Sequence, residues 1–238
     1  MPGARPRRVV LLGPQALEIT LGRVREELER EGVMPERAPV ATVTAGWQER
    51  EGEGDVLDRE LGGRGVGLAL YARSERVAEE DPEFARAHRE MQDRLKVLRR
   101  AYDIRLGHLI RAHHELLGVA GHGDDPVLAR ERDAALDAIR ALDARHLERI
   151  REIRADLECA FDPSGREAIV RQRREVAEIL RDVPAVAIAG GHVAALLNRL
   201  RLLDIGAALE GKVVMVTGAS SGIGEAAARM IGEAGGTV

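Results

Sequence analysis

The sequence predicts an α/β protein, a Rossmann-like three-layer parallel sheet into which a long α-helical hairpin is inserted. Two observations lead to this prediction. Short apolar runs rich in β-branched residues alternate with amphipathic helical segments, as in parallel sheets that are covered by helices on both faces. Between residues 75 and 182 the strand pattern gives way to a dense Arg, Glu, Ala and Leu composition with helical spacing. We therefore expect a first part of the sheet domain at 1–74, the hairpin and a return helix at 75–182, and the remainder of the sheet domain at 183–238.

The first part contains alternating strand and helix signals. Apolar runs predict strands at 7–13, 38–46 and 66–71, and amphipathic spacing predicts helices at 17–31 and 55–61. Gly32 follows the first helix, where glycine is the usual terminator. Strand, helix and strand joined by short connections indicate parallel pairing.

The middle part is predicted to be helical throughout. Leucine, isoleucine and methionine recur at helical spacing on both sides of a Gly- and Asp-rich break at 118–126, and the second run continues from 127 to 161. Two long helices joined by a turn form a helical hairpin. Its many charged residues are typical of a solvated face. Residues 162–165, Asp-Pro-Ser-Gly, then break the chain before a further helix at 166–181.

The last part returns to the strand pattern and contains the most specific motif. Strands are predicted at 183–191 and 212–217, with a helix at 192–203 between them. A Gly-x-x-x-Gly-x-Gly turn follows the last strand. Such a turn between strand and helix lets the backbone approach a diphosphate and directs free N–H groups at it. The predicted phosphate-binding residues are Thr217, Gly218, Ser220, Ser221, Gly222, Ile223 and Gly224.

This stretch resembles the start of a short-chain dehydrogenase/reductase, whose Thr-Gly-x-x-x-Gly-x-Gly signature falls on Thr217, Gly218, Gly222 and Gly224. The resemblance covers only about the last thirty residues and implies NAD or NADP as the cofactor. In that family, catalysis comes from a later Ser and a Tyr-x-x-x-Lys pair. The two tyrosines of this sequence are followed four residues later by Glu75 and Leu106, so the pair is not present here.

Residues 7–205 carry a second resemblance, to class I glutamine amidotransferase-like, peptidase-E-related proteins. Its motifs are the strand at 7–13, the run Val-Ala-Thr-Val-Thr-Ala-Gly-Trp-Gln-Glu-Arg at 40–50 and the run Ala-Ile-Ala-Gly-Gly-His at 187–192. In that family the glycine pair lies beside the active site, and the next strand ends in a Gly-x-Ser-x-Gly turn that carries the nucleophile. Here the next strand ends in Gly-Ala-Ser-Ser-Gly at 218–222.

The second resemblance leaves Ser220 and His192 as candidate catalytic residues. A Gly-x-Ser-x-Gly turn exposes its serine beside backbone N–H groups that can hold an oxyanion. The family places its histidine after the serine, whereas every histidine here precedes Ser220. His192 directly follows a buried strand, where α/β proteins place their sites. The alternative is that His192 opens a helix and bonds to backbone or solvent.

Composition narrows the function classes. A formal net charge of -4 argues against a nucleic-acid-binding surface. Cys159 is the only cysteine, so neither an intramolecular disulfide nor a cysteine-rich zinc site is expected. The apolar run at 9–12 is too short for a signal or membrane segment, which makes a cytoplasmic protein without a membrane partner the expectation. A homo-oligomer is left open.

Taken as a whole, the sequence predicts an amidotransferase-like α/β protein with an incomplete catalytic centre and a weak NAD(P)-type phosphate-binding turn. Two alternatives stay open. One is a fragment of an NAD(P)-dependent short-chain oxidoreductase, and the other is a peptidase-E-like serine hydrolase with its nucleophile at Ser220. We expect a small-molecule phosphate or dinucleotide as ligand, and no metal site.

Overall fold

The structure is a computed structural model of the 238-residue chain and describes residues 6–13, 19–119 and 125–218. The chain divides into two compact units. One contains the described part of Met1–Asp81 and Pro163–Val238, and the other is Pro82–Asp162.

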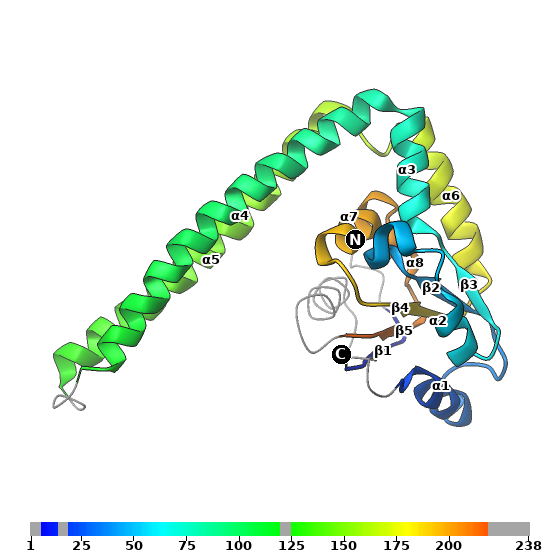
Figure 1. Ribbon diagram of the computed structural model, residues 1–238, viewed down its shortest axis with the longest axis horizontal. Coiled ribbons are helices and arrows are strands. Elements are labelled where there is room, and N and C mark those ends of the chain that lie inside the picture. Colours follow the sequence, from blue (N-terminus) through cyan, green and yellow to red (C-terminus); the bar gives the residue numbers. More distant parts are fainter. Residues whose placement is uncertain (1–5, 14–18, 120–124, 219–238) are drawn as a thin grey trace. The chain divides into compact units, whose positions relative to one another are not determined.

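The first unit is built on a parallel sheet. Within the described residues, this sheet has five strands in the order β1-β5-β4-β2-β3, and each neighbouring pair is parallel (Figure 1). The strands are β1 (Arg8–Leu11), β2 (Val40–Val43), β3 (Gly65–Gly67), β4 (Ala185–Ile188) and β5 (Val213–Val216). All residues of β2, β4 and β5 are buried, because helices cover both faces, and this is why they form continuous apolar runs. The predicted α/β fold class is confirmed.

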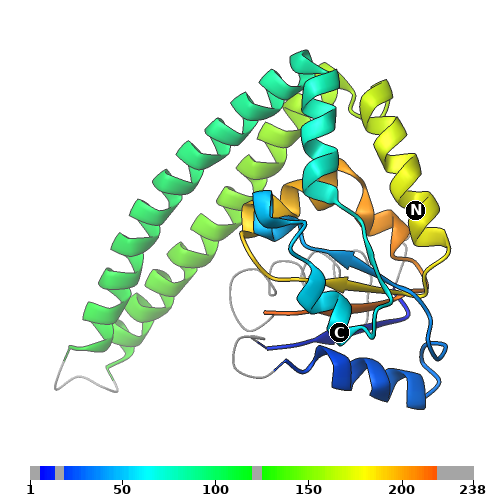
Figure 2. The same ribbon diagram turned by 45° about the vertical axis from the view of Figure 1, so that its right-hand side comes forward.

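Helices cover the two faces of the sheet (Figure 2). They are α1 (Leu21–Arg30), η1 (Ala45–Arg50, a 3₁₀ segment), α2 (Asp55–Glu60), α3 (Leu70–Glu80), α6 (Glu167–Arg181), α7 (Val193–Leu202) and α8 (Ile205–Ala208). Helices α1 and α2 pack on one face through Leu21, Leu28 and Leu57. Helices α6, α7 and α8 pack on the other, together with the start of α3.

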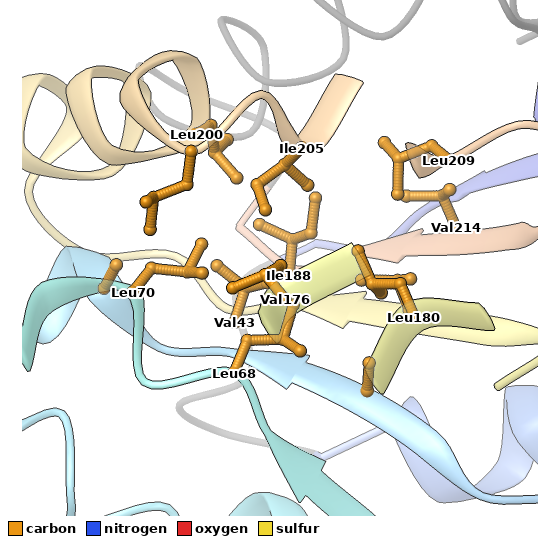
Figure 3. Packing of buried hydrophobic residues seen from close by; sticks show 14 of the residues in the cluster. Val43, Leu68, Leu70, Val176, Leu180, Ile188, Leu200, Ile205, Leu209 and Val214 are labelled. Atoms are coloured by element: carbon orange, nitrogen blue, oxygen red, sulfur yellow. The ribbon is translucent and has the colours of Figure 1, made fainter. Parts of the chain in front are cut away.

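Side-chain alternation along the strands divides the core into two layers. Val43, Ile188 and Val214 point toward Val176, Leu180, Leu200 and Ile205 from the helices (Figure 3). Val40, Ala185, Ala187 and Met215 belong to the layer beneath α1 and α2. Fully burying one such aliphatic side chain stabilises the fold by about 1.5–3 kcal/mol. The sheet is therefore held firmly at its centre, and its carboxyl edge is a fixed platform for the loops.

The third strand is shorter than the sequence predicts. We expected a strand at 66–71, but β3 ends at Gly67 and α3 begins at Leu70. Ala69 takes a left-handed conformation with φ 50° and turns the chain into the helix. Leu68 and Leu70 are fully buried against the α6 and α7 layer, so their apolar character reflects entry into a helix rather than an extended strand.

The second unit is a helical hairpin, which confirms the predicted insertion. Helices α4 (Pro82–Leu117) and α5 (Pro126–Phe161) each contain 36 residues and pack along each other. The Asp125 side chain accepts a hydrogen bond from the Val127 N–H at 2.8 Å and caps α5, with Pro126 in the first turn. Helices α3 and α6, at the two ends of the predicted 75–182 segment, belong to the sheet unit, where Arg73 of α3 donates to Gln172 of α6 at 2.8 Å.

Among the described residues, no helix is both long and apolar enough to cross a bilayer.

Candidate functional site

The candidate site is the carboxyl edge of the sheet, where the first described residues after β1, β2, β4 and β5 meet. Ligands of open α/β sheets bind outside this edge, at the topological switch point. There the chain connections that leave two neighbouring strands run in opposite directions along the sheet. Strands β2 and β4 are such neighbours, because the chain leaves β2 toward β3 at one end of the sheet and leaves β4 toward β5 on the other side. The edge between them is therefore the expected place for a site.

Two glycine turns meet at this place with almost no side chain between them. The His192 N–H donates to the Gly46 carbonyl at 2.6 Å. A Cβ added to Gly191 would lie 2.5 Å from the Gly46 carbonyl carbon and oxygen, and Gly191 has φ 144°, a conformation that L-residues rarely adopt. Only glycine fits at Gly191, so the β2 and β4 turns are locked together through their backbones.

The β5 turn continues the same backbone network. The Thr217 hydroxyl accepts a hydrogen bond from the Gly190 N–H at 3.2 Å, and the Thr217 side chain is almost fully buried. Gly218 has φ 70°, and its N–H donates to the Gly13 carbonyl at 3.1 Å. A Cβ at Gly190 would lie 3.4 Å from the Thr217 carbonyl oxygen. Thr217 and Gly218, the first two predicted phosphate-binding residues, thus lie directly beside the Gly190–Gly191 turn.

The remaining residues of the predicted phosphate-binding turn lie outside the described residues. These are Ser220, Ser221, Gly222, Ile223 and Gly224. Their role as anion ligands, and that of Ser220 as a nucleophile, stays a prediction.

His192 is exposed at the carboxyl end of β4 and begins α7. Its Nδ1 accepts a hydrogen bond from the Ala195 N–H at 3.2 Å. A backbone N–H can only donate, so Nδ1 is the acceptor and the neutral imidazole carries its proton on Nε2. To serve as a general base, His192 would have to give up this helix cap. The geometry is that of the alternative in which His192 opens a helix and bonds to backbone.

A polar cluster that the sequence did not reveal surrounds Tyr71 at the start of α3. The Tyr71 hydroxyl donates to Glu49 at 2.9 Å, and the Arg199 guanidinium lies over the Tyr71 ring, 4.4 Å from its centre. Arg199 also reaches Glu75 at 3.5 Å. The pKa of Tyr71 is raised above its ordinary value, first by the hydrogen bond to Glu49 and second by burial. Glu49 has a lowered pKa, first through a backbone hydrogen bond and then through Tyr71.

No local pattern could have revealed this cluster. Tyr71 and Arg199 belong to helices that are far apart in the sequence, and they meet because α3 and α7 pack on the same face of the sheet. The one local signal was the group of acidic residues at 49–58, which begins six residues after β2 ends at Val43. Such a group is usually solvent-exposed, but here it borders the carboxyl edge.

Comparison with known proteins yields no relative: no family model, no curated protein and no solved structure matches the chain.

Proposed function

We propose that this chain is an amidotransferase-like α/β protein with an incomplete catalytic centre, and that it binds the phosphates of a small molecule at the carboxyl edge of the sheet. The ligand class is a dinucleotide, NAD or NADP, and the binding element is the turn that begins at Thr217 and Gly218. The observation that carries the proposal is the position of this turn, which leaves an inner parallel strand beside a second glycine turn.

The N–H groups that would hold the anion are those that follow Gly218, because the Gly190 N–H already donates to Thr217 and the Gly218 N–H to Gly13. The β4 and β5 turns approach each other at Gly190 and Gly218 without intervening Cβ atoms. Anions bind where backbone N–H groups point outward and no side chain blocks access, and this is the arrangement that a Gly-x-x-x-Gly-x-Gly turn provides after a buried strand. An anion held mainly by backbone N–H groups is expected to bind with a roughly millimolar dissociation constant, about 4 kcal/mol.

Calorimetric titration of the full chain with NADP, NAD and inorganic pyrophosphate tests the proposal. We expect weak binding of all three, and we expect Gly222→Val to abolish it because the valine side chain would fill the turn. Gly206→Ala in α8 is the matched control, since a Cβ there meets no atom within 4 Å. Binding that survives Gly222→Val would place the anion elsewhere. Micromolar binding would show that the upstream sheet contributes far more than proposed.

The reductase and hydrolase alternatives rank second because each needs a proton-transfer group that the described geometry does not supply. The Tyr71 hydroxyl donates to Glu49, and the residue four positions later is Glu75 rather than lysine. His192 has its Nδ1 lone pair engaged with the Ala195 N–H. We therefore expect neither reductase nor peptidase turnover from the purified chain. Hydrolysis that disappears in Ser220→Ala would instead favour the hydrolase.

A further inference from the structure

An acidic cavity lies beside β3, the strand at the edge of the sheet. Its volume is about 680 Å³, which falls within the usual range for a small-molecule site. The floor is formed by Thr42, Gly65 and Gly67, and the walls come from the loop after β2, from α2 and from α3. Neither Thr217 nor Gly218, the two described residues of the proposed phosphate-binding turn, lines it.

The floor is bare at Gly67, whereas at Gly65 an added Cβ would lie 2.8 Å from the Asp58 carboxylate. Gly67 pairs with Thr42 of β2, and the nearest atom to a Cβ added at Gly67 is the Thr42 Oγ1, 4.0 Å away. Thr42 is only 8% exposed. Its hydroxyl makes no hydrogen bond to the residues that the structure describes, and the oxygen is open to the cavity rather than sealed in the core. A hydroxyl that opens into a cavity can bond to a ligand there.

The walls carry a strong excess of negative charge. Among the described residues that line the cavity, the acidic ones are Glu49, Glu51, Asp55, Asp58, Glu75 and Glu79, and the basic one is Arg76. Several of these carboxylates are held by neutral donors, which orient them without cancelling their charge.

Those neutral donors are backbone and phenol groups. Glu51 accepts from the N–H groups of Tyr71 and Ala72, both at 2.9 Å, and Asp58 accepts from the Gly65 N–H at 2.7 Å. Glu49 accepts from the Tyr71 hydroxyl, and its lowered pKa keeps it ionised at neutral pH. Most of these carboxylates are exposed to solvent, and Glu75 also lies 3.5 Å from Arg199. The cavity therefore attracts a cation through its net negative charge.

We propose that this cavity binds a small organic polyamine. An ammonium group offers three N–H donors and no acceptor, which matches a lining of carboxylates and a free threonine hydroxyl. The described residues place no three acidic, histidine or cysteine side chains close enough together to hold a metal ion. The carboxylates are instead distributed around the walls, an arrangement that suits an extended cation with more than one charged nitrogen.

Calorimetric titration of the full chain with spermidine tests this site. The buffer contains about 0.15 M salt, which screens non-specific attraction between spermidine and the negative charge of the protein. The decisive variant is Gly67→Leu, which fills the floor at a position where a Cβ has room. We expect it to weaken spermidine binding at least about tenfold while the thermal melting curve stays cooperative. Thr42→Val, which replaces only the hydroxyl, should weaken binding several-fold, and so should Asp55→Asn combined with Glu79→Gln.

Glu36→Gln provides the matched control, because Glu36 is an exposed carboxylate of the same unit that does not line the cavity. It should leave the affinity unchanged, as should Gly222→Val, which separates this site from the proposed phosphate-binding turn. The proposal is overturned if wild-type protein gives no binding heat, if Glu36→Gln weakens binding as much as the cavity variants, or if folded Gly67→Leu binds normally. Displacement of spermidine by micromolar Mg²⁺ would overturn it in favour of a metal site.

Discussion

Gly191 is the residue on which the geometry of the carboxyl edge depends most. Substitution by alanine would force a side chain into a φ of 144° and place its Cβ 2.5 Å from the Gly46 backbone. Backbone strain and overpacking each cost about 1–3 kcal/mol, so we expect Gly191→Ala to lower the free energy of unfolding by about 3 kcal/mol. Urea denaturation measures this loss.

Gly206→Ala is the control for that measurement, because its backbone is helical and a Cβ there meets no atom within 4 Å. It should leave stability unchanged or raise it by up to about 1 kcal/mol. Equal losses for the two variants would mean that the contact between the β2 and β4 turns is not what requires glycine at position 191.

At this scale the sequence predicted those candidate residues whose proposed role depends on a local turn. Thr217 and Gly218 follow an apolar strand and carry a recognisable glycine spacing, and the structure places them at the carboxyl edge of the sheet. Thr42 and Gly67 could not have been recognised, because they become neighbours only through the pairing of β2 with β3. An unpaired hydroxyl is a property of three-dimensional surroundings and leaves no trace in spacing.

At the scale of elements, the hairpin contains a histidine in its helix–helix contact. The His146 ring stacks on Tyr102 of the opposite helix, with ring centres 4.1 Å apart, and the Tyr102 hydroxyl donates to Asp143 at 2.8 Å. Burial, followed by the charge of Arg99, lowers the pKa of His146 below its ordinary value, with Asp103 and Asp143 acting in the opposite direction. The folded hairpin therefore favours neutral His146.

This histidine should make stability depend on pH. In the unfolded chain the pKa of His146 is near its ordinary value of about 6.5. The unfolded chain therefore binds the proton more readily than the folded chain does. Stability is lost as the pH falls from above the unfolded pKa toward the lowered pKa of the folded chain. Thermal melts followed by circular dichroism should show wild type losing stability between about pH 7 and pH 5.5 relative to His146→Leu. His108→Gln, at an exposed position of α4, should behave like wild type. An equal pH dependence in wild type and His146→Leu would contradict this role.

Element types were more predictable than element ends. The 36-residue helices α4 and α5 were evident because apolar spacing is sustained over many turns. The end of β3 was not, since Val66, Leu68 and Leu70 continue a period of two past the strand. The left-handed φ of Ala69, which is unusual for alanine, is what ends the extended conformation.

At the scale of the whole molecule, the sheet unit should fold without the hairpin. Neither hydrophobic cluster of the sheet unit includes a residue from Pro82–Asp162. The chain ends that excision would leave are already held near each other, because Arg166 forms a two-point ion pair with Asp81, with a distance of 2.7 Å between Nη2 and Oδ1. Replacing 82–162 by a short Gly-Ser linker should therefore leave a cooperative melt within a few degrees of the parent.

Asp81→Ala in the excised protein provides the companion test. It should lower the melting temperature further, because it leaves the partly buried Arg166 guanidinium without its carboxylate. A product without cooperative melting would show that the sheet unit depends on Pro82–Asp162.

The strand order could not be predicted from the sequence. Alternating strands and helices indicate a parallel sheet, but local patterns do not show that β1 pairs with β5 and that β4 enters between β5 and β2. Parallel pairing is decided by how complete layers of helices pack on both faces, and that information is distributed over the whole chain.

The same strand order determines when the protein can fold as the ribosome makes it. The two strands between β1 and β2 are β5 and β4, which are translated last among the described strands, so β1 has no partner until residues 213–216 have emerged. The helices α4 and α5, whose contacts are close in sequence, can pair long before that. During synthesis the chain should therefore contain a folded hairpin while the apolar early strands are still unpaired. We expect chaperones to matter most during that interval.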